Sequence, residues 1–186
     1  STHSTQLSSV SKISSMNILS RKDVKTEVYI PSNKLELRNI RCIERYLDAI
    51  RSDILFAKSV ILVEGDAELI LIPALVKKTL GVSLEEMGIS LIKMDGTVFK
   101  HISDLFHEDR IRSYCSIITD LDQAFITHEN NTFADAEYIK AQLNAQKSGA
   151  ERKTALDEYT DNNTYINAFY AENTFETELV SYSQNV

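Results

Sequence analysis

The chain has 186 residues, 43% hydrophobic and 25% charged, with a formal net charge of −7. The length fits one domain plus an appendage, and the composition is ordinary for a soluble globular protein. No apolar stretch reaches the roughly 18 residues that a membrane span needs. The acidic balance argues against tight nucleic-acid binding by this segment alone, because phosphate contacts need Lys and Arg. It does not exclude nucleic acid as a substrate, since a bound metal ion changes the local field. Two cysteines without metal or disulfide spacing indicate a reducing, cytoplasmic compartment.

The N-terminal part of the chain differs from the rest. Residues 1–38 are dense in Ser and Thr and contain one short predicted strand at 27–30. Apolar residues then recur at three- and four-residue spacing over 40–54, which predicts a helix. We therefore expect 39–57 to be a helix that connects the N-terminal segment to a separate domain at 58–186.

Strands and helices alternate through that domain. The predicted strands are 59–63, 89–94, 115–119 and 164–169, and the predicted helices are 66–80, 98–107 and a short one from Thr174. This alternation predicts an α/β fold with a mainly parallel central sheet flanked by helices. The polar stretch 123–163 reads as a solvated helical insertion, with Gly149 as a break.

Acidic clusters follow two of the predicted strands. Glu64 and Glu68 come after the first strand, and Asp120 and Asp122 come after the third. Ligand sites in open α/β sheets lie beyond the carboxyl ends of the strands, so these side chains are expected to meet. Like charges that meet need a cation, and carboxylates are the ligands that Mg²⁺ and Mn²⁺ prefer. The sequence therefore predicts a cage for one or two such ions.

Each of these features also has a simpler interpretation. Acidic residues after strands can merely stabilise the first turn of the next helix. Gly65 and Gly96 can be ordinary turn residues, or they can let the backbone pass close to a bound metal or phosphate. The chain has no GxxxxGK[ST] phosphate loop, so it cannot be a complete P-loop ATPase.

Together these residues resemble a TOPRIM domain, the Rossmann-like fold shared by topoisomerases, bacterial primases and OLD (overcoming lysogenisation defect) nucleases. The TOPRIM pattern has a Glu after the first strand, a Gly after the second and an Asp-x-Asp after the third. Here these are Glu64, Gly96 and the pair Asp120 and Asp122. The resemblance covers about 58–182.

The closer resemblance is to the OLD family. Residues 56–68 are similar to the start of that family's TOPRIM domain, where a second Glu stands at the place of Glu68. Residues 174–179 resemble its Thr-Leu-Glu segment, which implies that Glu176 is a further metal ligand. The first four residues resemble the switch-histidine segment that ends the family's ABC-type ATPase domain, and His3 would be that histidine.

The resemblance implies the organisation of a longer protein. Residues 1–38 would be the end of an ATPase domain and a linker, and the chain would be a C-terminal fragment. Two family parts are missing from it: the phosphate-loop half of the ATPase, and a downstream Lys that stabilises the transition state. We therefore expect the fragment to be incomplete as an enzyme.

The implied function is that of a bacterial, metal-dependent DNA endonuclease or nickase in anti-phage defence. Two Mg²⁺ or Mn²⁺ ions would be held by Glu68, Asp120, Asp122 and Glu176, with Glu64 as a ligand or the general base. ATP would act only through the missing domain. DNA is the expected substrate, a homo-oligomer the expected assembly and an accessory defence protein a further partner, with no membrane involved. The alternatives are a catalytically silent TOPRIM module for assembly or regulation, and a primase-like TOPRIM.

Overall fold

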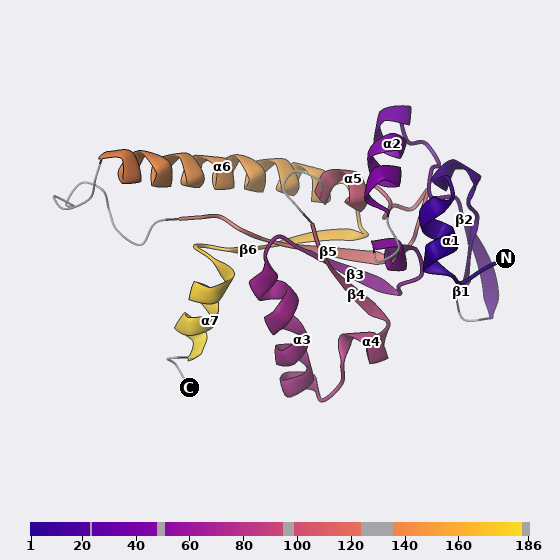
Figure 1. Cartoon of the computed structure of the whole chain (residues 1–186), viewed down its shortest axis with the longest axis horizontal. Helices are drawn as coiled ribbons and strands as arrows, with labels where there is room; N and C mark the ends of the chain where they lie inside the picture. Colours follow the sequence, from indigo (N-terminus) through magenta and orange to yellow (C-terminus); the bar gives the residue numbers. More distant parts are fainter. Residues whose placement is uncertain (23, 48–50, 95–98, 124–135, 184–186) are drawn as a thin grey trace.

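The computed structural model describes residues 1–22, 24–47, 51–94, 99–123 and 136–183. Its centre is a four-stranded sheet in the order β4-β3-β5-β6, in which every neighbouring pair is parallel (Figure 1). The strands are β3 (Ser59–Val63), β4 (Ile89–Lys93), β5 (Tyr114–Asp120) and β6 (Ile166–Ala171). The predicted α/β fold with a parallel sheet flanked by helices is confirmed, and each predicted strand lies within two residues of the observed one.

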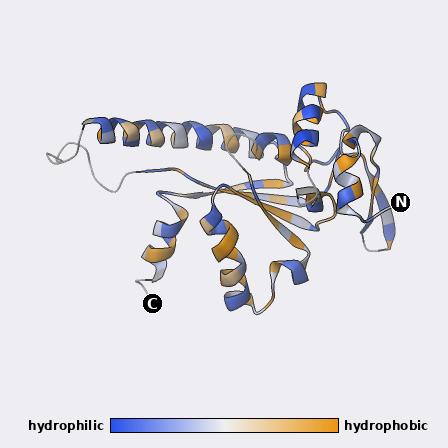
Figure 2. Cartoon of the chain, in the orientation of Figure 1, coloured by the Kyte–Doolittle hydropathy of each residue, from blue (hydrophilic) through white to orange (hydrophobic). Residues whose placement is uncertain are grey.

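Both faces of the sheet are covered, as a parallel sheet requires. Side chains alternate between the faces along β3: Val60 and Leu62 belong to the larger core cluster, and Val63 belongs to the smaller one. Figure 2 shows the apolar residues gathered along the strands, whereas the long helix beside them is largely hydrophilic.

The helices divide between these two faces (Figure 1). The smaller cluster takes side chains from α3 (Asp66–Leu80), α4 (Leu84–Met87) and α7 (Phe175–Ser183). The larger cluster takes side chains from α2 (Leu37–Tyr46), α5 (Phe99–Ser103) and α6 (Ala136–Thr160). Helix α3 has the predicted bounds and ends at Gly81, whose left-handed backbone (φ 76°) suits a glycine C-cap.

The N-terminal segment packs onto the sheet domain at the amino ends of the strands (Figure 1). It contains α1 (Thr5–Val10), a 3₁₀ turn η1 (Ile13–Ser15) and an antiparallel hairpin of β1 (Ile18–Lys22) and β2 (Lys25–Tyr29). Ile13 and Tyr29 are buried in the same cluster as Val60. The segment therefore shares the core of the sheet domain, and its origin in an ATPase domain stays a prediction.

The predicted connecting helix over 39–57 is wrong in extent. Helix α2 begins at Leu37 and ends at Tyr46, and a separate 3₁₀ helix, η2 (Arg51–Leu55), precedes β3. Residues 48–50 lie outside the described part of the chain. The apolar spacing still marks the buried face, because Ile43 and Ile54 are both fully buried.

The stretch 123–163 is the crossover from β5 to β6. Parallel neighbours need such a crossover, and α6 supplies it, while 124–135 lie outside the described residues. The predicted break at Gly149 is wrong, because α6 runs through it. A Cβ at this position would overlap the carbonyl oxygen of Leu121, so glycine lets α6 approach the segment after β5.

Within the described residues, no helix combines the length and the apolar character needed to cross a membrane.

Candidate metal centre at the carboxyl ends of the strands

One pocket of about 230 Å³ collects the predicted acidic residues beyond the carboxyl ends of β3 and β5. Its lining residues are Glu64, Gly65, Asp66, Ala67, Glu68, Asp120, Asp122, Arg152 and Glu176. All five predicted carboxylates are therefore brought to one place, although they come from four different elements or the loops that follow them. Gly96 lies outside the described residues.

Glu64 follows β3 and is held by two donors. The Thr119 hydroxyl donates to Glu64 Oε2 at 2.6 Å, and Arg152 Nη1 donates to Glu64 Oε1 at 3.2 Å. Thr119 is fully buried on β5. The two-residue alternation of a strand places Glu64 on the face of Val60 and Leu62, which is the face that α6 covers. Glu64 is thus fixed in orientation on the α6 side of the pocket.

Asp120, the last residue of β5, has an unsatisfied oxygen. Its Oδ1 is buried and has no hydrogen-bond partner in the described part of the chain. Burial, followed by the nearby negative charges of Glu68, Asp122, Glu176 and Glu64 in that order, raises the pKa of Asp120 to about 6. A buried acceptor among like charges has the environment of a group that lacks its cation.

Glu68 lies in the first turn of α3 and is 3% exposed. Gly65 makes room for it, because a Cβ at position 65 would overlap the Glu68 carboxylate. The group close to Gly65 is thus the Glu68 carboxylate, and the predicted approach of a metal or phosphate to Gly65 stays a prediction.

Asp122 lies in a turn after β5 and not in an extension of the strand. Its backbone is left-handed (φ 54°), so strand alternation does not govern where its side chain lies. The segment is held by the connection after β6: the amide of Asp122 donates to the carbonyl of Asn173, and the amide of Gln123 donates to the carbonyl of Glu172. Asp122 still reaches the pocket, through this turn.

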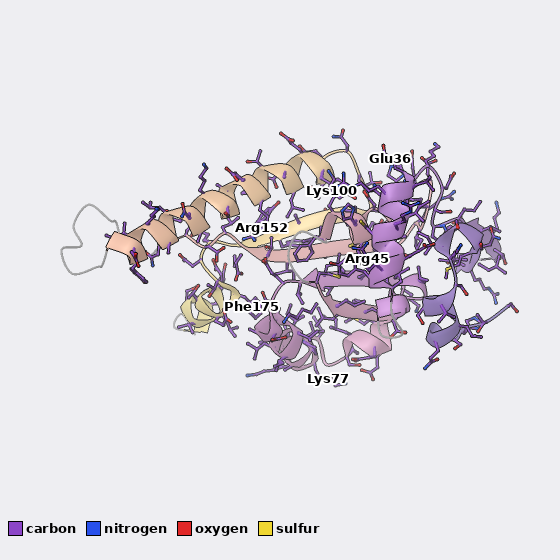
Figure 3. The ribbon with its side chains drawn as sticks, turned by 45° about the horizontal axis from the view of Figure 1, so that its top comes forward. Glu36, Arg45, Lys77, Lys100, Arg152 and Phe175 are labelled. Atoms are coloured by element: carbon purple, nitrogen blue, oxygen red, sulfur yellow. The ribbon has the colours of Figure 1, made fainter. Side chains whose placement is uncertain are left out.

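Arg152, on α6, is the site residue that the sequence does not reveal (Figure 3). Besides Glu64, its guanidinium donates from Nη2 to the carbonyl oxygen of Asp120 at 2.6 Å and to Asp122 Oδ2 at 3.2 Å. Gly149, one turn earlier, allows this approach. Within a polar helix, no spacing or composition signal distinguishes Arg152 from other surface cations.

Two further acidic residues line the rim. Asp66, with a side chain 73% exposed, pairs with Lys93 Nζ at 2.8 Å. Glu176 is exposed in the first turn of α7. Asp66 is thus already neutralised by a surface cation, whereas Glu176 adds negative charge to the surroundings of Asp120.

His3 is not part of this pocket. Its ring lies 6.3 Å from that of Phe56, which precedes β3. The acidic pocket is at the other end of the strand, and five residues of strand span about 16 Å. The predicted role of His3 as a nucleotide-sensing histidine stays a prediction.

The donor chemistry suits a hard divalent cation, because several carboxylates converge and one buried oxygen is unpaired. Their arrangement is not a closed coordination shell: in the described part of the chain, no three His, Cys, Asp or Glu side chains are gathered closely enough to hold a metal ion. Glu64 and Asp122 accept hydrogen bonds from Arg152, while the charges of Glu68 and Asp122 act most strongly on Asp120.

Comparisons with known proteins found a family model and solved structures to which part of this chain is similar. Residues 55–122 match the family model described as overcoming lysogenization defect protein-like, TOPRIM domain. Among solved structures, the C-terminal region of the Xanthomonas campestris pv. campestris OLD protein is 26% identical, with 69% of this chain and 57% of that chain covered and a TM-score of 0.40. The C-terminal region of the Burkholderia pseudomallei OLD protein is also 26% identical, with 68% and 59% covered and a TM-score of 0.41.

The chain thus spans less than two thirds of the length of either structure. A search of curated proteins gives no match. The matched segment contains Glu64, Glu68, Asp120 and Asp122, whereas Glu176 and Arg152 lie beyond it. Residues 55–122 are therefore similar to an OLD-like TOPRIM domain, a nucleic-acid-related class of domain that generally binds divalent metal ions.

Proposed function

We propose that the acidic pocket is the active site of a metal-dependent DNA endonuclease or nickase. The observation that carries this proposal is the buried, unpartnered oxygen of Asp120 among carboxylates beyond the strand ends of a TOPRIM domain. A nuclease uses such carboxylates to hold divalent cations against a phosphodiester.

The residues divide into two groups in this proposal. Glu68, Asp120, Asp122 and Glu176 would hold Mg²⁺ or Mn²⁺, with two ions as the expected number. When bound, such ions lower the pKa of an attacking water and stabilise charge on the leaving oxygen. Glu64 is either a further ligand or the general base, and Thr119 orients it through the 2.6 Å hydrogen bond.

Arg152 gives the pocket its only cationic lining side chain among the described residues. A guanidinium has several donors in a fixed plane and binds phosphate oxygens in pairs. Arg152 would add its attraction for a phosphodiester to that of the bound cations.

The wider function follows from the same resemblance and is proposed for the intact protein. ATP bound by a preceding ATPase domain would regulate cleavage, and the biological role would be defence against phage in the bacterial cytoplasm. DNA is the proposed substrate, within a homo-oligomer and with an accessory defence protein as a further partner.

One observation favours a second function, a catalytically silent TOPRIM module for assembly or regulation. Arg152 pairs with Glu64 and Asp122, as a permanent replacement for a cation would. Such a module would bind a metal ion or a partner and would not cleave DNA. No described contact favours a primase-like activity.

The test is nicking of supercoiled plasmid by the intact protein with Mg²⁺ or Mn²⁺, compared with EDTA. Glu64→Gln and Asp120→Asn should each reduce metal-dependent nicking at least 100-fold, while Asp161→Asn, an exposed Asp after α6, should nick like the wild type. Absence of nicking by the folded wild type under every metal and nucleotide condition would favour the silent module.

A further inference from the structure

A second cavity lies between α5 and α6, next to the acidic pocket. Its volume is about 480 Å³, within the range of roughly 300–1,000 Å³ that is usual for small-ligand pockets. The lining residues that matter here are Phe99, Lys100, Arg152, Ala155, Leu156 and Tyr159. Figure 3 shows Lys100 and Arg152 beside α6, with Arg152 nearer the middle of that helix.

Arg152 joins the two sites, because it lines both the acidic pocket and this cavity. Its Nη atoms donate to Glu64, Asp120 and Asp122. Its Nε is buried and has no hydrogen-bond partner among the described residues. A molecule whose phosphate reaches the acidic pocket would therefore meet, on the other side of Arg152, the entrance of the cavity.

The cavity combines an apolar wall with positive charge. Phe99 and Leu156 are buried, and Tyr159 is half-buried. The Tyr159 hydroxyl donates to Asp104 Oδ1 at 2.6 Å, so the ring, and not the hydroxyl, is left for the cavity. Lys100 Nζ lies 5.9 Å from the centre of that ring. Aromatic rings beside cations are the features that bind single-stranded nucleic acid, through base stacking and phosphate contacts.

The charge of the lining favours an anion. Its cations are Lys100 and Arg152, and its one carboxylate among the described residues is Glu151. Glu151 is 68% exposed and lies 3.9 Å from Lys147 Nζ, so its charge is partly balanced outside the cavity. An amphipathic ligand with one anionic end matches these walls, and a nucleotide is such a ligand.

We propose that this cavity binds the nucleotide next to the scissile phosphate of the substrate strand. The base would lie against the apolar wall of Phe99, Leu156 and Tyr159, and the phosphate would lie near Lys100 and Arg152. This inference rests on the proposed nuclease function, because that function places a DNA strand at Arg152. It adds that the strand continues toward α5 and that one nucleotide leaves the base stack.

Two substitutions test the cavity without touching the acidic pocket. Ala155→Trp would fill the cavity, and Lys100→Glu would reverse the charge of its wall. Their matched controls are Ala141→Trp, the same enlargement at an exposed position earlier on α6, and Lys78→Glu, the same charge change at the far end of α3. Circular dichroism and thermal unfolding establish that each variant is folded.

The measurement is binding of a fluorescein-labelled single-stranded DNA 12-mer to the intact protein by fluorescence anisotropy, in Ca²⁺ and in EDTA. We expect Kd to rise at least fivefold for Ala155→Trp and Lys100→Glu, and to stay within twofold for both controls. Lys100→Glu should also lower the salt dependence of binding. Wild-type affinity in both cavity variants, equal losses in the controls, or no binding by the wild type in either condition would overturn the inference.

Plasmid nicking by the same proteins separates this inference from the nuclease proposal. If the wild type nicks DNA and the cavity variants bind and nick normally, the cavity proposal is refuted and the nuclease proposal stands. If the wild type binds the oligonucleotide through the cavity but never nicks DNA, the cavity still binds a nucleotide and the nuclease proposal is refuted.

Discussion

Arg152 and Glu64 are 88 residues apart in the chain, yet their side chains form an ion pair at 3.2 Å across the carboxyl end of the sheet. Helix α6 makes this contact possible, since it returns over the strand ends on its way to β6. Through this pair, the acidic pocket balances part of its charge with a cation from its own chain.

Removing that cation should destabilise the metal-free protein. In Arg152→Gln, Glu64 and Asp122 lose a charged donor, and we expect the free energy of unfolding to fall by about 1–3 kcal/mol in EDTA. Mn²⁺ should recover part of this loss, because it neutralises the same carboxylates. Urea unfolding with and without Mn²⁺ measures both effects.

The matched control for Arg152 is Lys140→Gln, which removes an exposed cation from the same helix. Its unfolding should match that of the wild type under both conditions. An unfolding midpoint of Arg152→Gln that equals the control's in EDTA would show that the guanidinium does not stabilise the pocket.

Gly149 should be intolerant of even a methyl group. On an exposed helix face, Gly→Ala stabilises by up to about 1 kcal/mol. Here the added Cβ would overlap the Leu121 carbonyl, so we expect Gly149→Ala to lose about 1–3 kcal/mol by thermal or urea unfolding. Metal-dependent nicking should fall as well, because α6 would be pushed away and Arg152 with it. Asn144→Ala, at an exposed site on α6, should instead raise the free energy of unfolding. A gain in stability in both variants would contradict the close packing at Gly149.

The raised pKa of Asp120 predicts that the free energy of unfolding depends on pH. Its pKa in the folded protein is about 6, above the ordinary value of 3.8, so the folded state binds this proton more tightly than the unfolded state. The stabilisation from Asp120 is therefore complete below about pH 4 and is lost as the pH rises through 6. Metal binding needs the deprotonated form and should strengthen over the same range.

The measurement is the unfolding free energy of the wild type minus that of Asp120→Asn, which cannot titrate, from pH 4 to 7.5 in EDTA. This difference should decline with rising pH, level off above about 7, and grow again at neutral pH when Mn²⁺ is added. A difference that stays flat across the range would mean that the carboxyl is not perturbed.

Thr119 allows the orientation of Glu64 to be tested separately from metal binding. Thr119→Val removes the hydroxyl that donates to Glu64 Oε2, and we expect nicking to fall about tenfold while Mn²⁺ affinity stays near the wild-type value. Thr119→Ser keeps the hydroxyl and should restore most of the activity. Equal activity in Val and Ser variants would assign Thr119 to packing alone.

Much of the fold could be predicted because its signals are local. The β-branched runs of β3 and β5, the periodicity of α3 and the glycine at its C-cap are each contained in a few neighbouring residues. The carboxylates Glu64, Glu68, Asp120 and Asp122 could be found for the same reason, since each follows a strand whose end is visible in the sequence.

The parts that the sequence could not reveal depend on long-range contacts. From the sequence, Gly149 is interpreted as a helix break, but its role depends on its contact with Leu121. Arg152 resembles a surface cation in the sequence, and only its contact with Glu64 places it in the site. The left-handed turn at Asp122 is held by the carbonyls of Glu172 and Asn173, about fifty residues later in the chain. Such contacts leave no periodicity or spacing from which they could be read.

The most direct test of the metal centre is Mn²⁺ binding to the intact protein by isothermal titration calorimetry at pH 7.5, for the wild type, Asp120→Asn and the exposed control Asp161→Asn. Our account predicts that the wild type and the control bind Mn²⁺ alike and that Asp120→Asn binds at least tenfold more weakly. Equal Mn²⁺ affinity in all three proteins, or no binding by the wild type, would contradict the assignment of this pocket as a metal site.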